Sequence, residues 1–112
     1  AWTDWNVLLD ERGGPNHVGN FCYAPLHADT RTGQLLFTNS YYYIGHFSKF
    51  IRPGARRVAA TASRDALETT AFRNPDGSVA VIVLNRTDQE QPFQLWIRGQ
   101  AAATTSRPHS IM

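Results

Sequence analysis

The sequence predicts an α+β chain in which one strand–loop–helix unit precedes an antiparallel β-sandwich. Residues 1–52 are rich in aromatic side chains and end in an amphipathic helical pattern, whereas the residues from 56 onward form short β-prone runs separated by turns. The change falls at Arg52-Pro53-Gly54, because proline cannot continue a helix and glycine permits the reversal that follows. We therefore expect two domains, residues 1–54 and residues 55–112.

The first domain should open on a strand over residues 2–9, whose apolar character is typical of a strand buried on both faces. Strong turn signals follow at Gly13-Gly14-Pro15-Asn16 and at Gly19-Asn20. They predict an extended connection over residues 10–39, with short strands around residues 25–28 and 34–37. Connections of this length inside compact domains are usually functional.

A helix is predicted after this connection, with Asn39 or Ser40 as its cap. Apolar residues then recur at the spacing of one helical face: Tyr43, Ile44, Phe47, Phe50 and Ile51. We expect that face to pack against other parts of the protein. A membrane-surface helix is the alternative, but such helices carry a basic polar face, and only Lys49 and Arg52 supply positive charge.

The second domain has the pattern of a β-meander, with strands predicted over residues 57–63, 67–73, 78–85 and 93–98 and a further strand from Ala101. Residues 79–84 are apolar throughout and should form a central strand. The tetrapeptide Asn74-Pro75-Asp76-Gly77 fits a type I turn. In the strand at 93–98, apolar residues alternate with Gln94 and Trp96, which predicts one buried and one wetter face. Four or five antiparallel strands predict part of a β-sandwich.

Composition and charge argue against several functions. The longest apolar run has six residues, far short of the roughly 20 that span a bilayer. The net charge is +2, and the arginines are scattered from Arg12 to Arg107 rather than gathered as a nucleic-acid footprint. Cys22 is the only cysteine, and the four histidines are spaced too irregularly for a zinc motif. We therefore predict no nucleic-acid partner, no metal, no cofactor and no transmembrane segment.

The chain begins with Ala1, and its single methionine is Met112. The opening residues already have the character of a buried strand, with no polar tail in front of them. We therefore expect the chain to be a piece of a longer protein.

Three segments, residues 2–21, 40–58 and 74–87, are similar to the glucosylceramidase type of family 30 glycoside hydrolases. The end of that family's catalytic barrel resembles residues 2–21, WTDWNVLLDERGGPNHVGNF. The helix that closes the barrel resembles residues 40–58, SYYYIGHFSKFIRPGARRV, and paired strands of the C-terminal sandwich resemble residues 74–87, NPDGSVAVIVLNRT. The resemblance implies the last β/α unit of a (β/α)8 TIM barrel, made of strand 8, its loop and helix 8, followed by a truncated β-sandwich.

The resemblance also implies hydrolysis of β-glucosides, such as glucosylceramide, or of β-glucan, with retention of configuration. Retention needs two carboxyl groups roughly 5–5.5 Å apart. In the family these are two glutamates on the fourth and seventh barrel strands, upstream of residue 1, and Glu11, Glu68 and Glu90 match neither. We therefore expect no catalytic residue in this chain, and no hydrolysis by the chain alone. A secreted or extracytoplasmic location is favoured.

Two residues are candidates for substrate binding, Trp5 and Asn20. Trp5 is expected at the carboxyl end of the first strand, where barrel enzymes hold their substrates, and its ring can stack on the C–H face of a sugar. Asn20 offers amide donors and an acceptor to sugar hydroxyls. The alternatives are a core tryptophan and a turn-forming asparagine, and the resemblance favours binding for both residues. His17 and Tyr23 stand where relatives often carry tryptophan and aspartate.

The competing function is a carbohydrate-binding or purely structural β-sandwich without catalysis. In the binding version, exposed aromatic residues such as Trp96 would grip the sugar. The two functions are distinguished by whether residues 1–52 belong to a barrel or to a linker, and their dense aromatic content favours the barrel.

Overall fold

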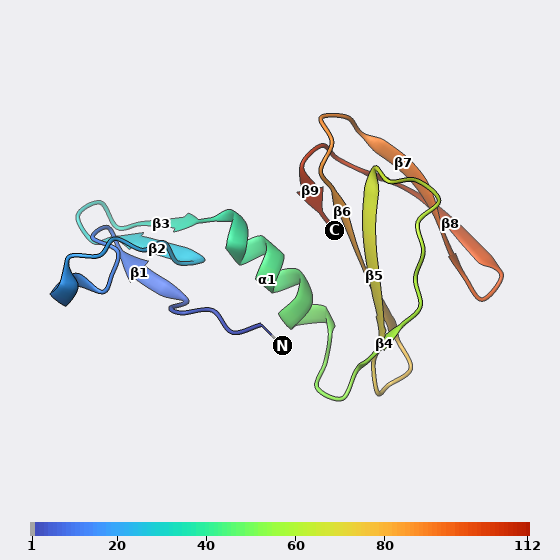
Figure 1. Ribbon diagram of the computed structural model, residues 1–112, viewed down its shortest axis with the longest axis horizontal. Helices are drawn as coiled ribbons and strands as arrows, with labels where there is room; N and C mark the ends of the chain where they lie inside the picture. The colour runs from blue at the N-terminus through green and yellow to red at the C-terminus, as the bar shows by residue number, and fades with distance from the viewer. Residues whose placement is uncertain (1) are drawn as a thin grey trace. The chain divides into compact units, whose positions relative to one another are not determined.

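The structure is a computed structural model that describes residues 2–112. It divides into two compact units, the first ending at Gly45 and the second spanning His46–Met112 (Figure 1). The first unit contains a three-stranded mixed sheet, and the second contains two antiparallel sheets. The predicted α+β chain with a C-terminal antiparallel sandwich is thus confirmed.

The sheet of the first unit has the order β1-β2-β3. Its strands are β1 (Leu8–Asp10), β2 (Leu26–Asp29) and β3 (Gln34–Phe37), and a single 3-10 turn, η1 (Asn16–Val18), lies between β1 and β2. Strand β2 pairs in parallel with β1 and antiparallel with β3. The two short strands predicted around residues 25–28 and 34–37 are confirmed to within one residue.

The long opening strand predicted over residues 2–9 is wrong. Only Leu8 and Leu9 of that segment are in β1, and Trp2, Trp5 and Val7 are 80%, 77% and 68% exposed. A strand buried on both faces needs hydrogen-bonded neighbours and a cover on each face. In residues 2–112 the segment before Leu8 has no paired strand, and β1 pairs with β2 alone.

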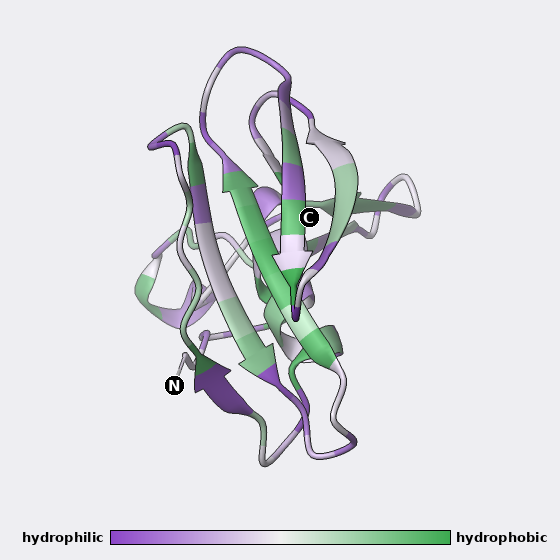
Figure 2. Cartoon of the chain, turned by 90° about the vertical axis from the view of Figure 1, so that its right-hand side faces the viewer, coloured by the Kyte–Doolittle hydropathy of each residue, from purple (hydrophilic) through white to green (hydrophobic). Residues whose placement is uncertain are grey.

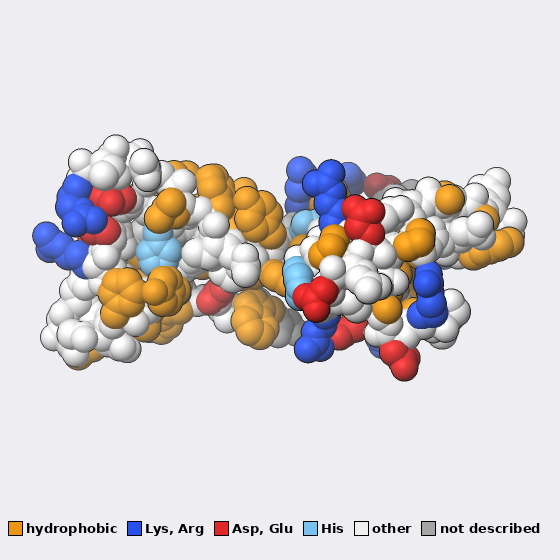
Figure 3. All heavy atoms as spheres, turned by 90° about the horizontal axis from the view of Figure 1, so that it is seen from above, with side chains coloured by type: hydrophobic (Ala, Val, Ile, Leu, Met, Phe, Trp, Pro, Cys, Tyr) orange, Lys and Arg blue, Asp and Glu red, His pale blue; other side chains and the backbone are white. Residues whose placement is uncertain are grey.

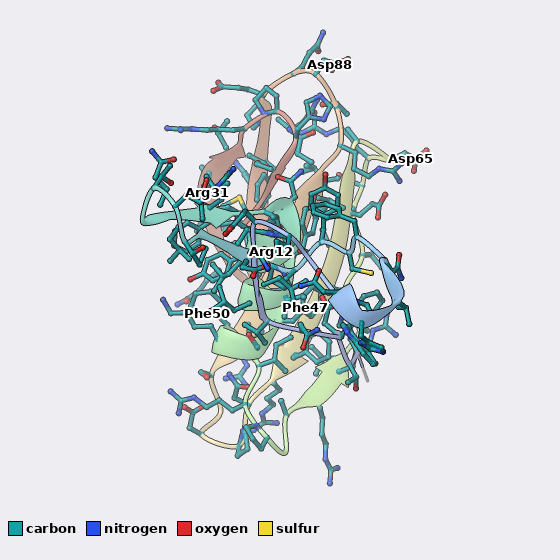
Figure 4. All side chains as sticks on the ribbon, turned by 90° about the vertical axis from the view of Figure 1, so that its left-hand side faces the viewer. Arg12, Arg31, Phe47, Phe50, Asp65 and Asp88 are labelled. Atoms are coloured by element: carbon teal, nitrogen blue, oxygen red, sulfur yellow. The ribbon has the colours of Figure 1, made fainter. Side chains whose placement is uncertain are left out.

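Helix α1 (Asn39–Phe50) confirms the predicted helix. Asn39 is already helical, so the flanking position is Thr38, whose hydroxyl oxygen lies 2.8 Å from that of Ser40. At the other end, Phe47 and Phe72, which both belong to the second unit, meet edge-on with their ring centroids 6.4 Å apart. Figure 4 shows Phe47 and Phe50 projecting from this helix.

The burial predicted for the apolar helix face is not observed within residues 2–112. Tyr43 and Phe47 are each 40% exposed, and Phe50 is 47% exposed. The edge-on contact with Phe72 therefore covers only part of the face. In the part of the chain that the structure describes, no helix is long and apolar enough to cross a membrane.

The second unit is a two-sheet sandwich. One sheet has the order β4-β5-β6-β9, and the other is the hairpin β7-β8. The strands are β4 (Arg56–Val58), β5 (Leu67–Arg73), β6 (Val79–Asn85), β7 (Gln91–Ile97), β8 (Gln100–Ser106) and β9 (Ser110–Ile111). Strand β5 has the predicted bounds, whereas β4 is shorter than the predicted strand at 57–63. The predicted meander is wrong, because the chain leaves β6 for the second sheet and returns as β9 on the other edge of β6.

Strand β6 is central, as predicted. Ile82 and Val83 of β6 are buried together with Leu67 and Ala71 of β5, and Figure 2 shows the apolar character of β6 along most of its length. The turn between β5 and β6 closes with a 3.0 Å hydrogen bond from the Gly77 N–H to the Asn74 carbonyl, so the predicted turn is confirmed. In β7 the predicted alternation also holds, since Phe93, Leu95 and Ile97 are half-buried while Gln94 and Trp96 are exposed.

The two sheets are tied together by the amide of Asn85, which is completely buried at the end of β6. Its Nδ2 donates to the carbonyl oxygens of Gln89, Ser106 and Arg107, at 2.8, 3.2 and 2.9 Å. Its Oδ1 accepts the N–H and the hydroxyl of Thr87. One side chain thus fastens the exit from β6 to the end of β8 and the start of the return to β9.

Candidate functional site

The candidate site lies in the connection between β1 and β2, residues 11–25, which we call the site loop. Its two arms touch at Gly13. A Cβ placed on Gly13 would lie 2.7 Å from the carbonyl oxygen of Cys22 and 3.0 Å from the ring of Phe21. Gly13 also has a φ of +65°, a conformation that residues with a side chain rarely adopt. Glycine is therefore required at this position for the loop to close.

The base of the site loop is bridged by His27, the second residue of β2. His27 is 8% exposed, and its Nε2 lies 2.9 Å from the backbone nitrogen of Ala24. Because an amide N–H can only donate, Nε2 must be the acceptor and the ring proton must be on Nδ1. Nδ1 then donates to the carbonyl oxygen of Asp10 at 3.3 Å. The neutral imidazole thus joins the residue before the loop to the last residues of the loop.

The tip of the loop is held by its own backbone. The single turn η1 ends at Gly19, which has a φ of +63° and donates its N–H to the Asn16 carbonyl at 3.1 Å. The N–H of Asn20 lies 3.4 Å from the Pro15 carbonyl. Asn20 is exposed, so its main chain is fixed while its side-chain amide faces solvent.

An exposed carboxylate joins the start of the site loop to the turn between β2 and β3. Glu11 accepts the N–H of Thr30 at 2.9 Å and the Thr30 hydroxyl at 3.0 Å. The Thr30 N–H, more than any other contact, holds the pKa of Glu11 below its ordinary value. In the same turn Arg31 pairs with Asp29 at 3.1 Å, and Figure 3 shows charges of both signs gathered at this end of the first unit.

The two predicted binding residues lie on either side of β1. Trp5 precedes the strand and is 77% exposed, and its backbone N–H donates to the side-chain carboxylate of Asp4 at 2.9 Å. It was expected at the carboxyl end of the strand, but the strand begins only at Leu8, so Trp5 lies ahead of the strand. Asn20 follows β1 on the site loop. Both side chains belong to the first unit and both are exposed.

Sequence reasoning missed the two residues that shape the loop. Gly13 was recognised only as part of a turn, and the signal for its closer role was the Gly13-Gly14 pair, both members of which are buried. His27 gave a weaker signal, a lone histidine between apolar neighbours. Its partners are backbone groups of Ala24 and Asp10, which no sequence pattern marks.

Outside the site loop, two carboxylates of the sandwich are paired with basic side chains. Glu68 of β5 pairs with Arg86 at 3.0 Å. Asp88 meets His109 at 2.7 Å. Within residues 2–112, no three His, Cys, Asp or Glu side chains are grouped so that they could hold a metal ion.

A concavity lies in the sandwich, between the four-stranded sheet and the β7-β8 hairpin. Its volume is about 1240 Å³. Apolar side chains from both sheets line it, including Leu67, Val83, Phe93, Leu95 and Ile97. Trp96 is also among the lining residues, although it is 66% exposed and lies on the wetter face of β7.

Comparison with known proteins assigns both parts of the chain. Residues 1–51 match the glycosyl hydrolase family 30 TIM-barrel domain, and residues 54–112 match the family's β-sandwich domain. Lysosomal acid glucosylceramidase from Mus musculus is 45% identical over 96 residues, which are 85% of this chain and 19% of that protein. The chain therefore spans about a fifth of the length of this relative.

Solved structures agree with these matches. SrfJ from Salmonella typhimurium superposes with a TM-score of 0.86 and is 40% identical, over 95% of this chain and 24% of SrfJ. An endo-β1,6-glucanase superposes equally well, with a TM-score of 0.86 and 26% identity over 96% of this chain and 24% of its own. The chain belongs to glycosyl hydrolase family 30.

Proposed function

We propose that this chain supplies the substrate-binding loop and the supporting β-sandwich of a retaining β-glycosidase. Residues 1–54 are the last β/α unit of its catalytic barrel, and residues 55–112 are its sandwich. The substrate is a β-glucoside such as glucosylceramide, or a β-glucan. The relatives support both substrate classes, because one is named a glucosylceramidase and another an endo-β1,6-glucanase.

The observation that carries the proposal is the construction of the site loop. Its main chain is pinned at its base, its arms and its tip, and it presents the amide of Asn20 to solvent. A sugar-binding group gains from such pinning, because little conformational entropy is lost when the ligand binds. Trp5 adds an exposed ring that can stack on a pyranose face.

The catalytic carboxyl groups come from elsewhere in the protein. A general acid of a retaining glycosidase needs a raised pKa. Glu11 has the opposite property, since its hydrogen bonds from Thr30 lower its pKa. Glu68 is paired with Arg86 on the sandwich. We propose that none of the glutamates here is catalytic, and that the chain alone does not hydrolyse glycosides.

One observation favours a second function, sugar binding by the sandwich itself. Trp96 is 66% exposed on β7, beside the concavity between the sheets. A single exposed ring supports weak binding at most, because carbohydrate recognition draws on stacking together with several hydrogen bonds. We therefore assign the sandwich a structural role, and Trp96 serves as the control in the test below.

The test joins this chain to the upstream barrel of a related enzyme and measures hydrolysis of a chromogenic β-glucoside. In this chimera, Trp5→Ala and Asn20→Ala should each lower kcat/KM by about 10-fold or more, which corresponds to about 1.4 kcal/mol of transition-state binding. Trp96→Ala removes an indole from the sandwich that is likewise exposed, and it should leave kcat/KM within about twofold of the parent.

The opposite pattern would contradict the assignment. If the folded chimera is active and neither Trp5→Ala nor Asn20→Ala changes its turnover, both residues are scaffold. If Trp96→Ala alone lowers the affinity for a soluble β-glucan, the sandwich is the sugar-binding part.

A further inference from the structure

We propose that His27 is a positioning residue for Asn20, acting by holding the two ends of the site loop together in its neutral, Nδ1-protonated form. The proposal rests on the proposed role of Asn20 in substrate binding. His27 itself is buried beneath the loop and has no part in sugar contact.

The backbone of His27 is fixed before its side chain is considered. In the register of the sheet His27 lies opposite Leu9 of β1 and Leu36 of β3. It therefore occupies the middle strand, and its backbone is held by a paired strand on each side. From this fixed point the imidazole reaches two loop ends that are 14 residues apart in sequence, Asp10 and Ala24.

The ring can satisfy both ends in only one form. Ala24 offers an N–H and needs an acceptor, while Asp10 offers a carbonyl and needs a donor. A neutral imidazole with its proton on Nδ1 meets both needs. The other tautomer and the imidazolium would each place an N–H against the N–H of Ala24, so they would open the loop at its base.

Closure at the base is transmitted to Asn20 through contacts between the arms. Above the His27 bridge, Gly13 abuts the carbonyl of Cys22, and further along Asn20 donates to Pro15. The ring of Tyr23 lies against His27 edge-on, with centroids 5.5 Å apart, and the ring of Phe21 lies against Tyr23. The segment that carries Asn20 is thus joined to His27 by a continuous series of contacts.

The experiment is a double-mutant cycle in the chimera described above. His27→Phe keeps an aromatic ring and removes both hydrogen bonds, whereas His27→Gln returns an acceptor near the position of Nε2. We expect His27→Phe to lower kcat/KM by about 10-fold, as Asn20→Ala does, and His27→Gln to remain within about threefold of the parent. In the Asn20→Ala background, His27→Phe should change kcat/KM less than about twofold, because residues that act through one another are not additive.

Two results would overturn the inference. If His27→Phe lowers kcat/KM by the same factor with and without Asn20, then His27 acts on the enzyme by another route. If His27→Phe has no effect in a chimera that Asn20→Ala does impair, the bridge is dispensable, while the role of Asn20 stands. If Asn20→Ala itself has no effect in an active chimera, the proposed binding role of Asn20 has failed, and that failure is distinct from the other two.

Folding is followed by thermal unfolding of every variant. If His27→Phe does not fold, His27→Asn takes its place in the cycle, because asparagine keeps a polar group near Nδ1 and still lacks the acceptor for Ala24. The same coupling to Asn20 is then expected. If the effects of His27→Asn and Asn20→Ala on kcat/KM are additive, the proposal is wrong.

Discussion

Gly13 lies so close to Cys22 that a Cβ on Gly13 would be 2.7 Å from the Cys22 carbonyl oxygen. The atom that a Cβ would meet belongs to the backbone and not to a flexible side chain. The arms of the site loop must therefore separate if any other residue replaces Gly13. Gly19 provides a natural comparison. Its φ of +63° is nearly that of Gly13, but a Cβ there would meet nothing within 4 Å.

Substitution by alanine should therefore be more costly at Gly13 than at Gly19. Gly19→Ala should cost about 1–2 kcal/mol, the penalty for alanine in a left-handed conformation. Gly13→Ala should cost that amount plus the displacement of the Cys22 backbone, and should also open the loop to protease. Thermal unfolding and limited proteolysis of the chimera measure both effects. Equal losses for the two variants would show that the arms are not in contact.

Asn85 should be the most sensitive polar position of the sandwich. Asn85→Ala leaves the carbonyls of Gln89, Ser106 and Arg107 without their shared donor, and Ser106 is only 1% exposed. Each buried group left unsatisfied costs about 1–3 kcal/mol, so we expect a total loss on the order of 3 kcal/mol in urea unfolding. Gln94→Ala, at an exposed position on β7, should change stability by less than about 0.5 kcal/mol. A small effect of Asn85→Ala would mean that water replaces the amide.

Asp76 makes the turn between β5 and β6 sensitive to acid. The hydroxyl and the N–H of Ser78 hold the pKa of Asp76 below its ordinary value of 3.8, and Arg52 adds to the effect. A carboxyl with a lowered folded-state pKa stabilises the fold above its unfolded pKa, and this contribution is lost as the pH falls through the folded pKa. Asp76→Asn should therefore lower Tm at pH 7, with a difference from the parent that shrinks below about pH 4.

The control for this measurement is Asp65→Asn, an exposed aspartate of the β4-β5 connection. It should give a smaller difference in Tm at pH 7 than Asp76→Asn does. A difference for Asp76→Asn that is the same at pH 7 and pH 2.5 would contradict the ionic origin of the effect.

Asn74 ties the end of α1 to the same turn and should respond independently of pH. Its Oδ1 accepts the N–H of Arg52 at 3.0 Å, and its Nδ2 donates to the Phe50 carbonyl at 3.0 Å. Asn74→Ala leaves the Arg52 N–H and the Phe50 carbonyl without the Asn74 amide, at a position that is only 6% exposed. We therefore expect the free energy of unfolding, measured in urea, to fall by about 2 kcal/mol. Asn74→Asp keeps the acceptor and loses the donor, and it should fall between the alanine variant and the parent.

The parts of the fold that were predicted correctly depend on neighbours in sequence. Strand β5 and the turn that follows it were predicted from β-prone residues ending at Asn74-Pro75-Asp76-Gly77, and turn geometry is set by its own four residues. The alternation in β7 and the existence of α1 likewise follow from local periodicity. The family resemblance came from three such contiguous segments.

The predictions that failed concerned pairing between distant segments. The apolar residues 2–9 were expected to form a strand, but a strand exists only where another strand bonds to it, and β1 gains its partner only from Leu8 onward. The two residues of β9 are too few to form a recognisable sequence pattern. In the structure β9 pairs with the edge of β6 at which β7 would pair in a meander.

The sequence by itself determined the class of fold, most of the strands and turns, the family, and Asn20 as a candidate on an exposed loop. The tertiary structure alone decided which edge of β6 is occupied, how Gly13 meets Cys22, and that His27 bridges Asp10 and Ala24. The physical reason is that a turn or a helical face is encoded within a few consecutive residues. The two hydrogen bonds of a buried ring, one accepted from a backbone N–H and one donated to a backbone carbonyl, exist only after the chain has brought these groups together.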